Sequence, residues 1–226
     1  MNIQEFAKMV DATAVQFKME EQEIVDLMNL VNKYQFKAYA VMPEYETLAR
    51  KMIKEAGNDV TLRINGIGFP TGKDPIEFKL AQIKAALEFG VGEFDFTNNI
   101  DYVKSGNYDA MLDELKQLVA AANANGPITT KVIIETPLLT DEEIVKATEV
   151  VVQSGATFVK TGTGHNGPTT LHQVELVSKT VAGRIQIKVA SGVRDLKTVE
   201  EMMKFGVTRF GIGIRGIKGI VEELGG

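Results

Sequence analysis

The chain has 226 residues, a formal net charge of −5 and an apolar fraction of 44%. This length and apolar content predict one domain, residues 1–226, with a sizeable core. The negative balance predicts no general attraction to nucleic acid or acidic membranes, and the absence of cysteine excludes disulfides, thiolate nucleophiles and thiolate metal sites.

Short apolar or β-branched runs alternate along the chain with longer amphipathic stretches. In chain order, the runs that predict strands are Lys8–Val15, Ala38–Met42, Thr61–Gly68, Glu93–Asn98, Lys131–Thr136, Thr157–Thr161, Ile185–Ser191 and Thr208–Ile214. The stretches that predict helices are Glu20–Tyr34, Tyr45–Ala56, Pro75–Phe89, Asp109–Asn123, Asp141–Gln153, Thr169–Val181, Leu196–Phe205 and Ile217–Leu224. The first run also has an alternative interpretation as the end of a helix.

Eight strands that are each followed by a helix predict an α/β fold, a single (β/α)8 barrel with an additional N-terminal helical segment. An open, doubly wound sheet is the alternative. Eight repeats in a short chain, with no insertion of domain size, favour the closed barrel. In such a barrel the active site lies at the carboxyl ends of the strands, so polar residues late in a strand become candidates for function.

Four charged residues stand within or at the ends of predicted strands: Asp11, Asp95, Lys160 and Lys188. A fifth, Glu135, ends its predicted strand. Buried charges are costly unless they are paired, so structural ion pairs are one interpretation. Two lysines on adjacent strands also lower each other's pKa, and a partly neutral lysine attacks carbonyl carbons. The pattern therefore predicts a Schiff-base enzyme.

Glycine-rich loops follow the last three predicted strands. Gly162 and Gly164 come after Lys160, Ser191–Arg194 comes after Lys188, and Gly211–Arg215 closes the last strand. Glycines let backbone N–H groups approach an anion, and the loops after strands 7 and 8 form the usual phosphate site of such barrels. We expect an anion site there. The two histidines of the chain are too few for a histidine-rich metal centre.

Several blocks in consistent order resemble the deoxyribose-phosphate aldolases, a class I aldolase family on a (β/α)8 barrel. They are Ile67–Pro70, Glu93–Ile100, Lys104–Asp109, Lys131–Thr136, Leu139–Ile144, Phe158–Gly164 and Lys188–Arg194. The resemblance implies that Lys160 forms the Schiff base, and that Asp95 moves a proton through a bound water. It also implies that Lys188 lowers the pKa of Lys160 and joins the proton relay.

The resemblance further implies reversible cleavage of 2-deoxy-D-ribose 5-phosphate to acetaldehyde and glyceraldehyde 3-phosphate, with no cofactor and no metal. It implies a cytoplasmic homo-oligomer, a dimer or tetramer, that binds small aldehydes and sugar phosphates rather than nucleic acid or membranes. The expected substrate-binding residues are Asp11, Thr161, Gly164, His165, Ser191, Gly192, Val193, Arg194, Gly211, Gly213 and Arg215. His165 has the alternative interpretation of an exposed loop residue.

The chain departs from the family pattern at the last strand, where Gly213, Ile214 and Arg215 stand in place of small hydroxyl residues. Gly162 likewise replaces the usual serine after the catalytic lysine. These changes leave the lysine chemistry intact and keep two alternatives open. One is a related lysine-dependent aldolase with a different phosphorylated or unphosphorylated aldol. The other, from another class, is a barrel that binds sugar phosphates without catalysis.

Overall fold

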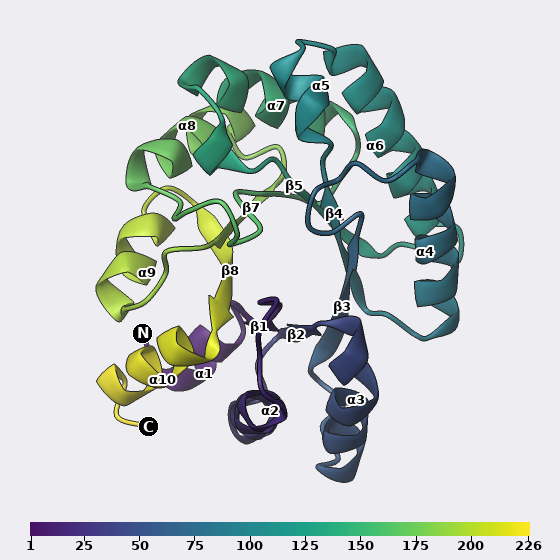
Figure 1. The fold of residues 1–226 in the computed structure, drawn as a ribbon. Coiled ribbons are helices and arrows are strands. Elements are labelled where there is room, and N and C mark those ends of the chain that lie inside the picture. Colours follow the sequence, from purple (N-terminus) through teal and green to yellow (C-terminus); the bar gives the residue numbers. More distant parts are fainter.

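The computed structural model describes all of residues 1–226 and forms a closed barrel of parallel strands in the order β1 to β8 (Figure 1). The predicted fold class is thereby confirmed. The strands are β1 (Val10–Ala14), β2 (Ala38–Val41), β3 (Leu62–Ile67), β4 (Glu93–Thr97), β5 (Thr129–Ile133), β6 (Phe158–Lys160), β7 (Gln186–Ala190) and β8 (Val207–Gly213).

Helices surround the barrel, and both termini lie beside α1 and α10 (Figure 1). The eight helices expected from the sequence are α2 (Glu21–Tyr34), α3 (Glu46–Glu55), α4 (Ile76–Glu88), α6 (Tyr108–Ala122), α7 (Asp141–Gln153), α8 (Leu171–Val181), α9 (Leu196–Met203) and α10 (Ile214–Glu223). The additional N-terminal helical segment is α1 (Ile3–Ala7). Short elements that were not expected are α5 (Ile100–Lys104) and the 3₁₀ turns η1 (Pro43–Tyr45) and η2 (Thr136–Leu138). None of the helices is both long and apolar enough to cross a membrane.

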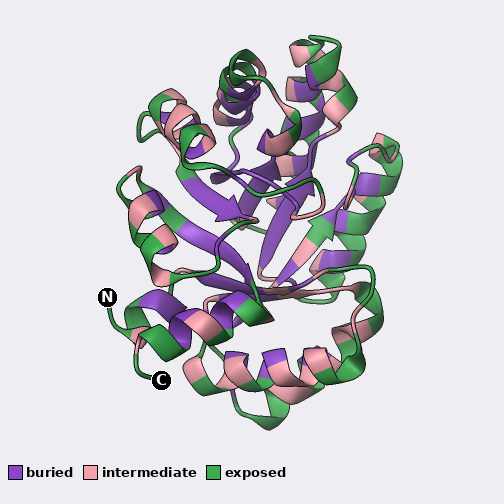
Figure 2. Cartoon of the chain, turned by 60° about the vertical axis from the view of Figure 1, so that its left-hand side comes forward, coloured by how far each residue is buried: buried purple, intermediate pink, exposed green.

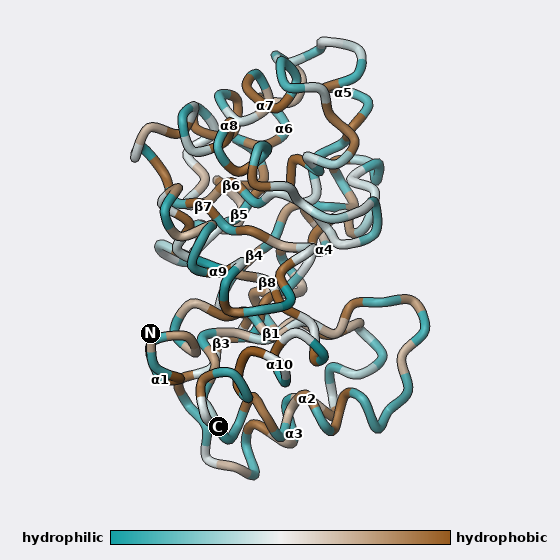
Figure 3. Tube along the Cα trace, turned by 90° about the vertical axis from the view of Figure 1, so that its left-hand side faces the viewer, coloured by the Kyte–Doolittle hydropathy of each residue, from teal (hydrophilic) through white to brown (hydrophobic).

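The core lies between the outer face of the barrel and the inner faces of the helices, as the buried residues in Figure 2 show. In α2, for example, Ile24, Leu27, Met28 and Val31 are buried at helical spacing while the acidic residues of its first turn face solvent. Figure 3 shows the corresponding alternation along the chain, where brown apolar stretches follow teal polar ones. Most charged side chains therefore remain outside the barrel, which makes those inside it conspicuous.

All eight observed strands differ from their predicted ranges by at least one residue at one end, and three of these differences have a clear local cause. The predicted strand Lys8–Val15 is partly the end of a helix, as its alternative interpretation had it. Lys8 is the C-cap of α1, and the strand begins at Val10. The fifth strand ends at Ile133 rather than Thr136, since Glu135 adopts a left-handed backbone with φ 61° and η2 follows. The last strand ends at Gly213, which is the N-cap of α10, so that Ile214 lies in the helix.

Strand register decides which side chains enter the barrel. Asp95 is paired with Lys131, Lys160 with Lys188, and Lys188 with Arg209. Residues that pair across neighbouring strands point to the same face of a sheet, and side chains two positions apart share that face. The interior of the barrel therefore collects charged residues from β4 through β8.

Candidate active site

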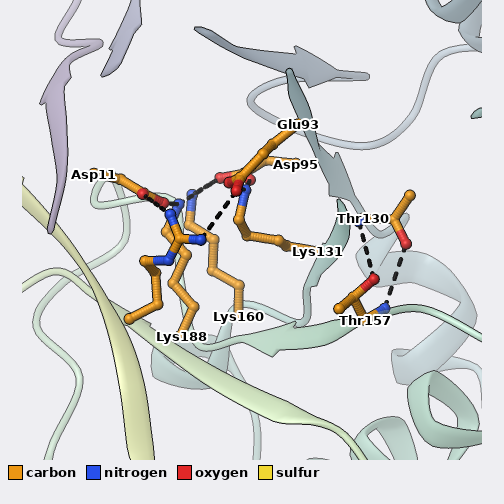
Figure 4. Close-up of polar contacts among 9 residues, drawn as sticks. Asp11, Glu93, Asp95, Thr130, Lys131, Thr157, Lys160 and Lys188 are labelled. Atoms are coloured by element: carbon orange, nitrogen blue, oxygen red, sulfur yellow. Dashed lines mark hydrogen bonds and ion pairs between the residues drawn. The ribbon is translucent and has the colours of Figure 1, made fainter. Parts of the chain in front are cut away.

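A network of ion pairs fills the barrel interior, with Asp95 of β4 at its centre (Figure 4). Its Oδ2 atom accepts hydrogen bonds from Lys160 Nζ at 2.8 Å and from Lys188 Nζ at 2.9 Å. Its Oδ1 atom accepts one from Lys131 Nζ at 2.8 Å. The two lysines that were expected to be neighbours thus share one carboxylate oxygen.

Two further carboxylates complete the network. Asp11 Oδ2 lies 2.5 Å from Lys188 Nζ, and Asp11 Oδ1 lies 2.6 Å from Arg209 Nη1. Glu93 contacts Lys131 Nζ at 2.7 Å and Arg209 Nη2 at 2.9 Å. The network therefore holds four basic and three acidic side chains. Its charges balance when one base is neutral, and Lys160 makes the fewest ion pairs.

The pKa values follow from this arrangement. Burial lowers the pKa of Lys160 to about 8, Asp95 opposes that shift, and the charges of Lys188 and Lys131 add to it. Burial acts to raise the pKa of Asp95, but Lys131, Lys160 and Lys188 together hold it well below the ordinary value. The pKa of Lys131 is raised, because its acidic neighbours outweigh its burial. Lys160 consequently loses its proton more readily than an ordinary lysine.

One cavity of about 940 Å³ opens at the carboxyl ends of the strands, and both Lys160 and Asp95 line it. Eight other expected site residues line the same cavity: Gly164, Ser191, Gly192, Val193, Arg194, Gly211, Gly213 and Arg215. Four do not: Asp11, Thr161, His165 and Lys188. Asp11 and Lys188 are fully buried and take part in the ion network. The cavity thus joins the lysine to the glycine-rich loops.

Residues of the loops after β7 and β8 line the cavity. Gly213 caps α10 without any side-chain hydrogen bond, and Ile214, Arg215 and Gly216 of the first turn line the cavity. Such a helix start favours an anion. Arg194 and Arg215 are both exposed at the mouth. An anion site at these loops stays a prediction, and no side-chain hydroxyl stands at the start of α10.

Two expected substrate contacts are already engaged in the protein. The Ser191 hydroxyl donates to the Gly167 carbonyl at 2.5 Å. The fully buried Thr161 hydroxyl accepts from Ala190 N at 3.2 Å and from Thr169 Oγ1 at 2.8 Å. Both side chains therefore connect the loops that follow β6 and β7, which fixes one wall of the cavity.

His165 lies between two aromatic rings at the barrel mouth. Its ring centroid is 4.6 Å from that of Phe17 and 5.2 Å from that of Phe69. Neither ring nitrogen has a hydrogen-bond partner, and both are shielded from solvent. The residue is thus more enclosed than the exposed loop residue of the alternative interpretation, and it links three loops.

Sequence reasoning missed three members of the ion network: Glu93, Lys131 and Arg209. Strand alternation was the signal available, because each lies two positions from an interior residue of its own strand, as Glu93 does from Asp95. All three are buried. No group of three or more His, Cys, Asp or Glu side chains is arranged to hold a metal ion.

Taken with its site, the fold defines an enzyme of the (β/α)8-barrel class, with a lysine and a carboxylate at the carboxyl ends of the strands. Residues 6–217 match the profile of the DeoC/LacD family aldolases, and the chain belongs to that family.

Relatives support this membership over nearly the whole chain. A deoxyribose-phosphate aldolase of Macrococcus caseolyticus is 40% identical over 223 residues, which cover 97% of this chain and 98% of that protein. One of Sinorhizobium medicae is 36% identical over 220 residues, covering 97% of this chain and 87% of that protein. Among solved structures, the aldolase QR15 is 32% identical with a TM-score of 0.84, covering 98% of this chain and 95% of that one. The family predicted from the sequence blocks is confirmed.

Proposed function

We propose that this protein is a class I aldolase that reversibly cleaves 2-deoxy-D-ribose 5-phosphate to acetaldehyde and D-glyceraldehyde 3-phosphate, with Lys160 as the Schiff-base residue. The observation that carries the proposal is geometric, since Lys160 Nζ lies 2.8 Å from Asp95 Oδ2 in a cavity that both residues line. Burial lowers the pKa of Lys160 to about 8. A lysine with such a pKa is partly neutral near pH 7 and attacks carbonyl carbons. The names of the relatives supply the substrate.

We propose the following reaction at Lys160. Its neutral amine attacks C1 of the open-chain sugar, and loss of water leaves an iminium. A base then takes the proton of the C3 hydroxyl, the C2–C3 bond breaks, and the bonding electrons move into the iminium to form an enamine. Glyceraldehyde 3-phosphate leaves. Protonation of the enamine at C2 and hydrolysis of the imine release acetaldehyde and restore the amine.

Asp95 is the proposed proton carrier for the enamine. Its carboxylate lies 2.8 Å from Lys160 Nζ and lines the cavity, so that a water molecule between it and C2 would complete the relay. Lys188 shares the Asp95 Oδ2 atom and also forms an ion pair with Asp11. Asp11 therefore contributes to the proposed relay by holding Lys188, and it has no contact with the cavity.

The phosphate is proposed to bind at the loops after β7 and β8. Gly192, Val193 and the first turn of α10 line this end of the cavity with backbone donors. Arg194 and Arg215 add positive charge at the mouth.

A cleavage assay tests the proposal directly. The protein is incubated with 2-deoxyribose 5-phosphate, unphosphorylated 2-deoxyribose and other phosphorylated aldols, and acetaldehyde and glyceraldehyde 3-phosphate are measured. We expect the highest kcat/KM for 2-deoxyribose 5-phosphate. A clear preference for another aldol would favour the related lysine-dependent aldolase, for which the lack of hydroxyls at Gly213 and Ile214 is the specific observation. No turnover of any aldol would favour a sugar-phosphate-binding barrel.

Two properties outside the site remain predictions. A homo-oligomer of two or four copies is expected, and light scattering during size-exclusion chromatography would measure the mass directly. A cytoplasmic location is likewise expected, together with no binding of nucleic acid at a net charge of −5.

A further inference from the structure

Glu135 is a buried carboxylate just beyond β5 that the proposed reaction does not use. It is 6% exposed, and its backbone is left-handed with φ 61° and ψ 56°. Residues with a Cβ atom rarely adopt this conformation, and the surrounding structure must then enforce it. The contacts around Glu135 therefore enforce this conformation.

The carboxylate of Glu135 binds the loop that leaves the Schiff-base lysine. Its Oε1 and Oε2 atoms lie 3.1 and 3.3 Å from the backbone nitrogen of Thr163. A Cβ atom at Gly162 would lie 3.0 Å from Oε1, closer than such contacts usually are. Asp95 and the other acids of the barrel pair with basic side chains, whereas Glu135 accepts its hydrogen bonds from this backbone N–H. Glu135 therefore holds the loop after β6 and does not neutralise a basic side chain.

The neighbours of Glu135 hold the same segment. Ile134 N donates to Lys160 O at 3.0 Å, and Thr136 N donates to Thr161 O at 2.7 Å. The backbone on both sides of Glu135 thus fixes Lys160 and Thr161, and its side chain fixes Thr163. Since Thr163 lines the cavity with Lys160, a shift of this loop would move the cavity wall relative to the reacting amine.

We propose that Glu135 is a positioning residue for Lys160, and that it acts through the reach of its hydrogen-bond acceptor rather than through its charge. The proposal also explains Gly162, because a residue without Cβ leaves the carboxylate room to reach Thr163 N. It rests on the proposed function, since the measured quantity is aldol cleavage. Wild-type protein assayed in parallel separates the two failures. An inactive wild type would refute the proposed function, whereas an active wild type with an equally active Glu135→Asp variant would refute only this inference.

Two matched variants separate the effect of the length of the Glu135 side chain from the effect of its charge. Glu135→Gln keeps an acceptor at the same distance and removes the charge. Glu135→Asp keeps the charge, is one methylene shorter, and adopts the left-handed backbone more readily than glutamate does. We expect Glu135→Gln to keep kcat/KM within about tenfold of wild type, because a neutral acceptor still binds the N–H group with about half the strength. We expect Glu135→Asp to lose about 100-fold, which is the usual effect of a displacement of about 1 Å at a reacting centre.

Thermal unfolding and borohydride trapping accompany these assays. The proposal expects both variants to unfold near the wild-type temperature and expects the aspartate variant to trap acetaldehyde slowly on Lys160. Wild-type kcat/KM in Glu135→Asp would overturn the proposal. So would a glutamine variant as impaired as the aspartate variant, since charge would then be what matters.

Gly162→Ala is an independent probe that displaces the carboxylate from the opposite side. Its Cβ atom would meet Oε1 in the wild-type background and would have room in the Glu135→Asp background. We expect Gly162→Ala to lower kcat/KM in the wild type and to add little to the loss in Glu135→Asp. Losses that multiply in the double variant would show that the two residues act independently, which would contradict the proposal even where one single variant folds poorly.

Discussion

Lys160 and Lys188 bind the same carboxylate oxygen of Asp95, which couples the protonation of the two ammonium groups. Burial is the largest cause of the low Lys160 pKa, and Lys188 is a smaller cause in the same direction. Imine formation needs the neutral amine, so the rate rises with pH as Lys160 loses its proton. We expect the rising limb of kcat/KM in the wild type to have an apparent pKa of about 8.

Replacing Lys188 by leucine tests this coupling. Removing a positive neighbour favours the ammonium form of Lys160, so the rising limb should move to higher pH. The pH dependence of kcat/KM is the measurement, and the exposed Lys84, changed to leucine, is the control. If the rising limb of the Lys188→Leu profile stays at the wild-type pH and the rate is near normal, the two lysines do not interact.

Asp95→Asn separates imine formation from proton transfer. An amide cannot accept and return a proton as a carboxylate does, so turnover should fall by about 100-fold or more. Borohydride should still trap acetaldehyde on Lys160, since the amine remains. If trapping disappears together with turnover, Asp95 serves to hold the lysines and the proton relay must be assigned elsewhere.

Arg215 tests how the far end of the substrate is bound. It is exposed at the cavity mouth in the first turn of α10, where a phosphate would gain a charge-assisted contact. Arg215→Ala should raise KM for 2-deoxyribose 5-phosphate about tenfold, the value of one such hydrogen bond. The KM for unphosphorylated 2-deoxyribose is the internal control. Equal changes for both substrates would refute a phosphate contact.

The candidate site was predictable where a charged residue interrupts an apolar run. Asp95, Lys160 and Lys188 were singled out in this way, and the structure places both lysines within hydrogen-bonding distance of Asp95. Glu93 and Arg209 were missed, because each stands near the start of its strand, where a charged residue resembles ordinary solvent exposure. Their burial depends on the closure of the barrel, which brings together residues more than a hundred positions apart.

At the scale of single elements, a second buried ion pair supports the loop after β3. Lys79 of α4 is fully buried, lies 2.7 Å from Glu114 of α6, and donates to the carbonyl of Gly72 at 2.5 Å. The segment from Gly68 to Gly72 includes Phe69, which lines the cavity. This pair therefore joins two helices to a loop of the active site.

We expect Lys79→Met to lower the free energy of unfolding by about 3 kcal/mol or more, since it leaves a buried carboxylate without its partner. Denaturant unfolding measures the loss. The double variant Lys79→Met with Glu114→Leu should recover most of it, because two apolar side chains can pack without a desolvated charge. A loss below about 1 kcal/mol in the single variant would mean that the pair contributes as little as a surface ion pair.

Amphipathic helices were predicted within a few residues of their bounds, because burial of one face sets their period. The predicted boundaries that were wrong by several residues lie where a strand ends or a helix begins because of the backbone conformation of one residue. The left-handed Glu135 ends β5 early, and the helix α10 begins directly at the N-cap Gly213. No residue preference in the sequence marks glutamate for that conformation. It follows from contacts with the loop after β6, which only the folded chain provides.

At the scale of the whole molecule, the overall negative charge contrasts with the interior of the barrel. The chain carries a net charge of −5, yet four basic and three acidic side chains meet inside the barrel. An anionic sugar is therefore attracted by local groups rather than by the general field. The alternation of strands and helices sufficed to predict the closed barrel, and closure converts scattered residues into one site.

The central claim is that Lys160 forms a covalent imine during aldol cleavage. The most direct measurement is borohydride reduction in the presence of acetaldehyde, followed by intact mass and peptide mapping of the wild type and of Lys160→Met. We predict one ethyl group on the wild-type chain, located on Lys160, with no adduct on the variant, whose cleavage activity falls by about 1,000-fold or more. An adduct that persists in Lys160→Met, or a wild type that turns over without any adduct, would contradict the account.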